Sequence, residues 1–297
     1  MSGIPGRSAV ALRPRSVLAL VLASLIGLLA FAWPLFATPN ATLSGANAPL
    51  VLALLLPLVL TVVVAEVAGG GLDVKAVALL GVLSAVGAAL RPLGAGTAGL
   101  ETVFFLLVLG GRVFGPGFGF VLGTTTLFGS ALLTGGIGPW LPFQMLGAAW
   151  VGLGAGLLPR RVTGRAEVAM LAAYGAVAGL LYGWALNLSF WPFTTGVAGE
   201  LSYVAGAPLA ENLHRFLVYS LVTSLGFDLG RALTNVVLIL VTGRAVLGAL
   251  RRAARRAAFV VDAPATPPAP ARIPGHERVG AGEPGVVAEP RGARRGA

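Results

Sequence analysis

The chain has 297 residues, of which 56% are hydrophobic and only 11% charged, compared with about 25% charged residues in soluble domains. It contains no cysteine, which excludes a disulfide framework, a thiolate metal site and a cysteine nucleophile. The net charge of +10 comes mainly from Lys and Arg beside hydrophobic runs and in the C-terminal tail, a placement that indicates membrane orientation rather than a nucleic-acid partner.

Hydrophobic runs recur along most of the chain, and we predict that they cross the membrane as helices. A bilayer core about 30 Å thick takes about 20 apolar residues in helical form. The last run is too long for one straight span, so either its first turns lie outside the bilayer or it breaks near Gly226. The eight predicted spans are residues 16–37, 49–69, 76–93, 99–114, 117–135, 141–158, 167–192 and 212–249.

The basic residues predict that both ends of the chain lie in the cytoplasm. Three arginines precede the first run and the loop after it, residues 38–47, has no charge, whereas Lys and Arg are enriched on the cytoplasmic side of membrane proteins. Arg91, Arg215 and Arg231 depart from this pattern. The basic residues that fall on the cytoplasmic side with an even number of spans are Lys75, Arg112, Arg160, Arg161, Arg165, Arg251, Arg252, Arg255 and Arg256.

The two ends of the chain need separate interpretation. The first run has a basic start, as a signal peptide has, but its apolar stretch is longer than usual and no clear A-x-A site follows it, so we predict a retained helix. From Asp262 onward the chain is rich in Pro, Ala, Gly and Arg and cannot bury a core. We predict a disordered cytoplasmic tail, whose arginines are either solvated or in contact with anionic lipid headgroups.

Small residues spaced by four mark several of the predicted spans. Gly81, Ala85 and Ala89 form such a stripe in the third run, and three other runs contain similar ones. Because lipid provides little hydrophobic drive for helix association, close approach of membrane helices depends on small residues. Each stripe indicates either packing within the bundle or a face for a partner membrane subunit.

Polar and aromatic side chains gather in the loops predicted to lie on the outer side. Such a mixture suits a pocket that stacks a planar or bulky organic ligand and orients it with a few hydrogen bonds. The alternative is an aromatic belt, because Trp and Tyr favour the membrane interface. We favour a pocket because the inner loops contain almost no Trp or Tyr. The candidate ligand-binding residues are Arg91, Glu101, Trp140, Gln144, Asn187, Trp191 and His214.

No catalytic or nucleotide-binding motif is present, so we expect neither an enzyme nor a bound cofactor or metal. The chain lacks a P-loop, an H-E-x-x-H motif and a G-x-S-x-G motif. Asp228 and Arg231 are three residues apart on one helical face and are predicted to neutralise each other. His214 is more typical of an interface residue than of a metal ligand, because the other histidine, His276, lies in the tail.

The segments LETVFFLLVLGGRVFGPGFGFVLG and SALLTGGIGPWLPFQMLGAAWVGLGAGLLPR, of which GPWLPFQM is the most specific piece, resemble substrate-binding S components of energy-coupling factor (ECF) transporters. These bacterial vitamin-uptake proteins have six membrane helices and bind their substrate at the outer face. They associate with a transmembrane coupling subunit and two ATPases. The resemblance implies that Ala85 and Ala89 meet the coupling subunit. The pattern is most similar to S components linked to cobalamin uptake, although a flavin, a thiamine-like compound or a deazapurine would suit the same outer aromatic pocket.

The resemblance implies an all-α integral membrane protein in the bacterial plasma membrane, with a six-helix core at residues 76–250. A cytoplasmic N-terminus at 1–15 and two extra transmembrane helices at 16–75 precede the core, and a basic tail at 251–297 follows it. Two alternatives remain open. One is a membrane enzyme acting on a lipid-like substrate through Glu101, His214 or Asp228, and the other is a scaffold with no ligand.

Overall fold

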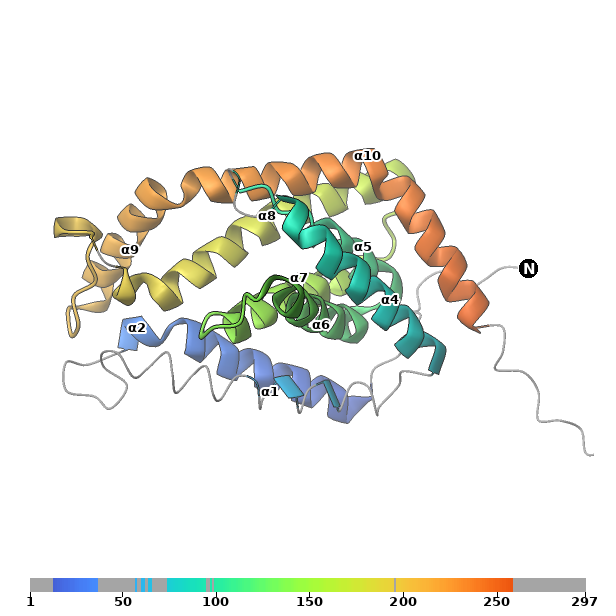
Figure 1. The fold of residues 1–297 in the computed structure, drawn as a ribbon, viewed down its shortest axis with the longest axis horizontal. Helices are drawn as coiled ribbons and strands as arrows, with labels where there is room; N and C mark the ends of the chain where they lie inside the picture. Colours follow the sequence, from blue (N-terminus) through green and yellow to red (C-terminus); the bar gives the residue numbers. More distant parts are fainter. Residues whose placement is uncertain are drawn as a thin grey trace, which may run out of the picture. The chain divides into compact units, whose positions relative to one another are not determined.

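The computed structural model describes residues 13–36, 57, 60–61, 64–65, 74–94, 97, 99–194 and 196–258, and the regular elements in these ranges are all helices (Figure 1). The predicted all-α fold is therefore confirmed for the described part of the chain. The tail predicted from Asp262 onward and most of the predicted span 49–69 lie outside the described residues. The helices are α1 (Pro14–Phe31), α2 (Trp33–Phe36), α4 (Val74–Leu90), η1 (Arg91–Gly94), α5 (Phe104–Phe114), α6 (Pro116–Thr134), α7 (Leu141–Leu157), α8 (Gly164–Phe190), η2 (Trp191–Phe193), η3 (Gly199–Leu201), α9 (Leu209–Thr223) and α10 (Leu225–Ala258).

Length and composition make several of these helices able to cross a membrane. Five are long and apolar enough, namely α1, α4 with η1, α6, α8 with η2, and α10. The helices α5 and α7 are apolar but shorter. A multi-pass membrane protein is thus supported, whereas the count of eight spans stays a prediction.

The last hydrophobic run is divided between two helices. The break falls at Ser224, between α9 and α10, two residues before the predicted position at Gly226. Next to the break, Thr223 donates a hydrogen bond to the carbonyl of Tyr219 at 2.7 Å, and its hydroxyl lies 3.2 Å from that of Ser224. At its other end α10 continues through Ala258.

Glycines bring the centre of the bundle into close contact. The helices α6 and α7 form a hairpin in which the backbones of Gly119 and Gly152 lie against each other, so that a Cβ at either position would collide with the carbonyl of the other. Gly123 lies in the same way against the carbonyl of Ala148. The hairpin thus uses a stripe of small residues for internal packing, as expected of membrane helices.

One end of the bundle brings together the ends of α4 and α6 and the starts of α5, α7 and α10. Hydrogen bonds between side chains of these segments define it, from Arg91 to Gln144 and from Arg231 to Glu101. We call it the Gln144 end. Figure 1 shows α10 running beside α8 away from this end, and the two helices are in extensive contact.

At the opposite end, which we call the Arg112 end, the chain carries most of its described basic residues. Arg112 closes α5 and binds Glu167 near the start of α8, which also accepts hydrogen bonds from Arg251 near the end of α10. The basic loop between α7 and α8 lies at the same end. The predicted separation of basic and polar loops therefore matches the fold, and the assignment of the Arg112 end to the cytoplasm stays a prediction.

The first helix packs against the rest of the bundle. The indole N–H of Trp150 on α7 donates to the hydroxyl of Ser24 on α1 at 3.1 Å, and Gly27 lies against Leu146. Beyond α1, the indole N–H of Trp33 donates to the carbonyl of Ser189 at the end of α8, at 3.1 Å. The helix α1 thus contributes buried contacts to α7 and α8.

Candidate functional site at the Gln144 end

Arg91 joins three helices at the Gln144 end. It opens η1 directly after α4, and its Nη2 donates to Oε1 of Gln144 at 3.1 Å, in the first turn of α7. Its Nη1 lies 3.5 Å from the hydroxyl of Ser130, a fully buried residue near the end of α6. Two of the predicted ligand-binding residues, 53 positions apart in sequence, are therefore in direct contact.

A second arginine, Arg231 on α10, contacts two carboxylates. Its Nη1 donates to Oδ1 of Asp228 at 2.7 Å, and its Nε donates to Oε2 of Glu101. Its guanidinium lies 5.3 Å from the ring centre of Tyr182 on α8 and donates to the carbonyl of Gly179 at 3.2 Å. The predicted pairing of Asp228 with Arg231 is confirmed, and Glu101 is the additional partner.

Burial makes this second cluster unusual for a membrane protein. The side chain of Asp228 is 2% exposed, that of Arg231 12% and that of Glu101 20%. The other carboxylate oxygen of Asp228, Oδ2, is buried without a hydrogen-bond partner among the described residues. Ionisable groups at membrane depth are costly and are found where they are paired or functional.

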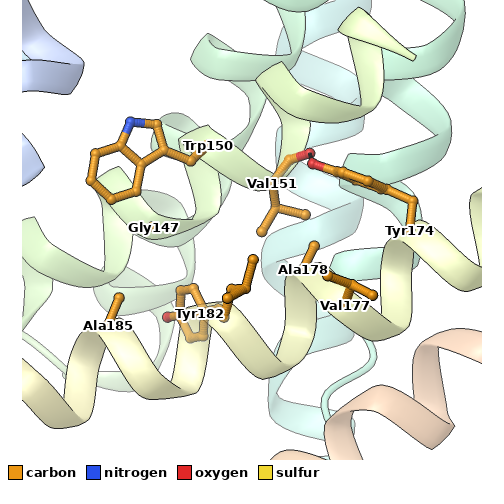
Figure 2. Close-up of a pocket in the computed structure, with 9 residues that line it drawn as sticks. Gly147, Trp150, Val151, Tyr174, Val177, Ala178, Tyr182 and Ala185 are labelled. Atoms are coloured by element: carbon orange, nitrogen blue, oxygen red, sulfur yellow. Dashed lines mark hydrogen bonds between the residues drawn. The ribbon is translucent and has the colours of Figure 1, made fainter. Parts of the chain in front are cut away.

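An apolar cavity of about 190 Å³ lies between α7 and α8. Figure 2 shows the rings of Trp150, Tyr174 and Tyr182 around it, together with the small side chains of Ala178 and Ala185. The hydroxyl of Tyr174 is engaged with the carbonyl of Val151 at 2.8 Å. The cavity is suited to an apolar group, and Tyr182 links it to the Arg231 cluster.

The remaining predicted residues do not form one pocket. Trp191 is 1% exposed, packs against Tyr203, Phe216 and Tyr219, and donates its indole N–H to the carbonyl of Leu201 at 2.7 Å. It lies in a separate small hydrophobic core beneath α9. Burial also raises the pKa of the Tyr203 hydroxyl in this core. The role of Trp191 in ligand binding stays a prediction, and in this conformation the indole is enclosed.

Three other predicted residues differ in their accessibility. Trp140, in the turn between α6 and α7, is 46% exposed, and His214 is exposed on α9. Asn187, near the end of α8, has a buried amide nitrogen that lacks a hydrogen-bond partner among the described residues. An unpartnered buried donor is unusual and calls for an acceptor such as a ligand or a water molecule.

The predicted partner face on α4 is open. Gly81, Ala85 and Ala89 are all exposed, and a Cβ added at Gly81 would meet nothing within 4 Å. The stripe is therefore not used for packing among the described residues.

Sequence reasoning missed the charged cluster at the Arg112 end. Glu167 is 2% exposed and accepts from Nε of Arg112 at 2.7 Å and from Nη2 of Arg251 at 2.7 and 2.8 Å. Arg112 also donates to the carbonyls of Leu158 and Pro159 at 2.9 and 3.1 Å. The signal in the sequence was a single acidic residue, Glu167, directly after the basic residues of the loop between α7 and α8. These contacts hold α5, α8 and α10 together, which is a structural role.

Comparison with known proteins returns no match, whether to protein-family models, to curated proteins or to solved structures. Within the described ranges, no three His, Cys, Asp or Glu side chains are grouped so that they could hold a metal ion.

Proposed function

We propose that the chain is the substrate-binding S subunit of an ECF-type importer in a bacterial plasma membrane, with the Arg112 end in the cytoplasm. The subunit captures a vitamin or a related micronutrient at the Gln144 end for ATP-driven uptake by partner subunits. The observation that carries the proposal is the contact of Gln144 with Arg91 at 3.1 Å. Gln144 belongs to GPWLPFQM, the segment on which the family resemblance chiefly rests. At one end of the bundle it lies among polar side chains that include Arg91 and Ser130.

The chemistry of the Gln144 end supports binding. Guanidinium, amide and carboxylate groups from η1, α7, α10 and the segment before α5 lie there, and an apolar cavity with aromatic walls lies nearby. Ligand sites typically combine an apolar lining with a few placed polar groups. The chain has no nucleotide-binding motif, so the energy for uptake comes from separate ATPase subunits.

The exposed stripe on α4 supports a partner subunit. Small side chains at Gly81, Ala85 and Ala89 leave a flat surface on which another membrane helix can approach closely. We propose that the transmembrane coupling subunit, which joins the two ATPases, contacts this face.

The binding step is tested with the purified chain in nanodiscs and a panel of radiolabelled vitamins that includes cobalamin, riboflavin, thiamine, biotin, pantothenate and folate. We expect one of these to bind tightly, and Gln144→Leu to weaken it because the amide that contacts Arg91 is lost. Arg215→Gln is the matched control, since Arg215 lies at the same end but pairs with Glu211 on the surface of α9. A protein that binds none of the panel, with and without its coupling subunit, would argue against the proposal.

A further inference from the structure

The arginines at the Gln144 end differ in whether they have a carboxylate partner. Arg215 forms an ion pair with Glu211 at 2.9 Å, and Arg231 forms ion pairs with Glu101 and Asp228. Within the described part of this end, Arg91 is the arginine that has no carboxylate partner. It is partly buried, and its hydrogen-bond acceptors among the described residues are the neutral oxygens of Gln144 and Ser130.

Described residues provide acceptors for only some of the hydrogen-bond donors of Arg91. A guanidinium has five N–H donors and accepts nothing, and Arg91 uses two of the five for Gln144 and Ser130. Because a guanidinium only donates, the amide of Gln144 turns its oxygen toward Arg91. The amide N–H₂ group of Gln144 then remains as a further donor beside the guanidinium.

A helix end adds to the positive potential at this point. Gln144 lies in the first turn of α7, where the helix dipole contributes partial positive charge. A second guanidinium, that of Arg231, cannot serve the same purpose, because two carboxylates and the carbonyl of Gly179 already occupy it. Within the described part of this end, the place for a further acceptor is therefore next to Arg91 and Gln144.

We propose that Arg91 and Gln144, with Ser130 supporting the guanidinium, bind an anionic oxygen group, a carboxylate or a phosphate. The inference rests on the proposed function and narrows it, since the micronutrient captured at the Gln144 end then carries such a group. A planar guanidinium binds carboxylate and phosphate oxygens in pairs, and the adjacent amide adds a further hydrogen bond. The phosphate of a lipid headgroup is also an anionic oxygen group. The experiment therefore distinguishes a bound micronutrient from a bound lipid.

The experiment compares wild type with Arg91→Gln, Arg91→Lys and the control Arg215→Gln. In nanodiscs, binding is measured for paired probes that differ in charge: pantothenate and pantothenol, biotin and biotinamide, riboflavin phosphate and riboflavin, thiamine phosphate and thiamine. A second arm measures retention of phosphatidylglycerol by native mass spectrometry of the same variants. Thermal unfolding of each variant shows whether it is folded.

We expect the anionic member of one pair to bind wild type, and Arg91→Gln to weaken it about 10- to 100-fold, the range expected for lost charge-assisted hydrogen bonds. Arg91→Lys should keep part of the affinity because the charge remains without the planar fork, and Arg215→Gln should match wild type. Loss of phosphatidylglycerol in Arg91→Gln alone would support the anion site with a lipid as its source.

The outcomes separate this inference from the proposed function. A neutral vitamin that binds wild type and folded Arg91→Gln equally, with no Arg91-dependent lipid, would overturn the anion site and leave the importer proposal standing. Arg91-dependent retention of phosphatidylglycerol without binding of any vitamin would overturn the importer proposal and support the anion site. If the protein bound no vitamin and showed no Arg91-dependent retention of phosphatidylglycerol, both the importer proposal and the anion site would be overturned.

Discussion

Arg231 shows how a single side chain holds the Gln144 end together. Its guanidinium contacts the loop before α5 through Glu101, its own helix through Asp228, and α8 through the carbonyl of Gly179. Removal of one partner from a buried charge group leaves the others uncompensated, which is costly at membrane depth. The stability of this end therefore depends more on Arg231 than on either carboxylate.

We predict that Arg231→Gln lowers the stability of the protein by about 3–5 kcal/mol, because it strands two buried carboxylates. Glu101→Gln should cost only about 1 kcal/mol, since Asp228 still neutralises Arg231 and the amide still accepts a hydrogen bond. Thermal unfolding in detergent measures both. If the two substitutions lowered the stability equally, the conclusion that this end depends mainly on Arg231 would be contradicted.

Some of these contacts could be predicted from the sequence, and others could not. The spacing of Asp228 and Arg231 placed them on one helical face and predicted their ion pair. Glu101 lies 130 positions from Arg231, and no local pattern relates them. The same limit applies to Arg91 and Gln144, which were each chosen for their predicted outer position, whereas their mutual contact follows only from the arrangement of α4 and α7.

At the scale of elements, the hydrophobic runs predicted helix positions well because lipid requires long apolar helices. The predicted runs 117–135 and 141–158 lie within one residue of α6 and α7 at each end. The run 99–114 was less accurate, since α5 begins only at Phe104. The described residues before α5 include η1 and Thr102, whose hydroxyl donates a hydrogen bond to the carbonyl of Leu90. Hydropathy does not distinguish such a segment from the start of a membrane helix.

The α6–α7 hairpin should be intolerant of any added side chain at its crossing point. We predict that Gly152→Ala destabilises the protein by about 1–3 kcal/mol or prevents folding, because the new Cβ collides with the carbonyl of Gly119. Gly81→Ala is the matched control, as nothing lies within 4 Å of that Cβ. It should be neutral or slightly stabilising, because Ala favours the helix. Unfolding temperature and the monodisperse yield distinguish the two variants.

The exposed face of α4 gives a prediction about assembly. We predict that Ala85→Leu weakens association with the coupling subunit about tenfold or more while ligand binding by the isolated chain is unchanged, because the added bulk blocks close helix contact on an exposed face of α4. Co-purification with the coupling module and vitamin binding are measured on the same preparation. A loss of both in equal measure would show that the stripe supports the fold of the chain instead.

At the scale of the whole molecule, the two ends of the bundle differ in character. The Arg112 end has the basic loop and a buried glutamate held by two arginines, and the Gln144 end has the polar and aromatic residues. Positive residues on one side predict orientation in the membrane. Composition and charge were thus enough to predict an all-α membrane protein. The exposure of Trp140 and the burial of Trp191 could not be predicted in this way, because they depend on tertiary packing.

Orientation can be tested directly because the chain lacks cysteine. We predict that a membrane-impermeant maleimide labels Ile137→Cys, in the exposed turn at the Gln144 end, in intact bacteria. Arg161→Cys, in the exposed loop at the Arg112 end, should react only after the membrane is permeabilised. The reverse pattern would place the proposed ligand site in the cytoplasm.

Uptake into proteoliposomes tests the importer proposal most directly. The chain is reconstituted with its coupling subunit and the two ATPases, and accumulation of the vitamin that it binds is followed with and without ATP. We predict ATP-dependent accumulation that Gln144→Leu reduces and Arg215→Gln leaves unchanged. Absence of accumulation for every vitamin of the panel, or accumulation that proceeds equally without ATP, would contradict the proposed function.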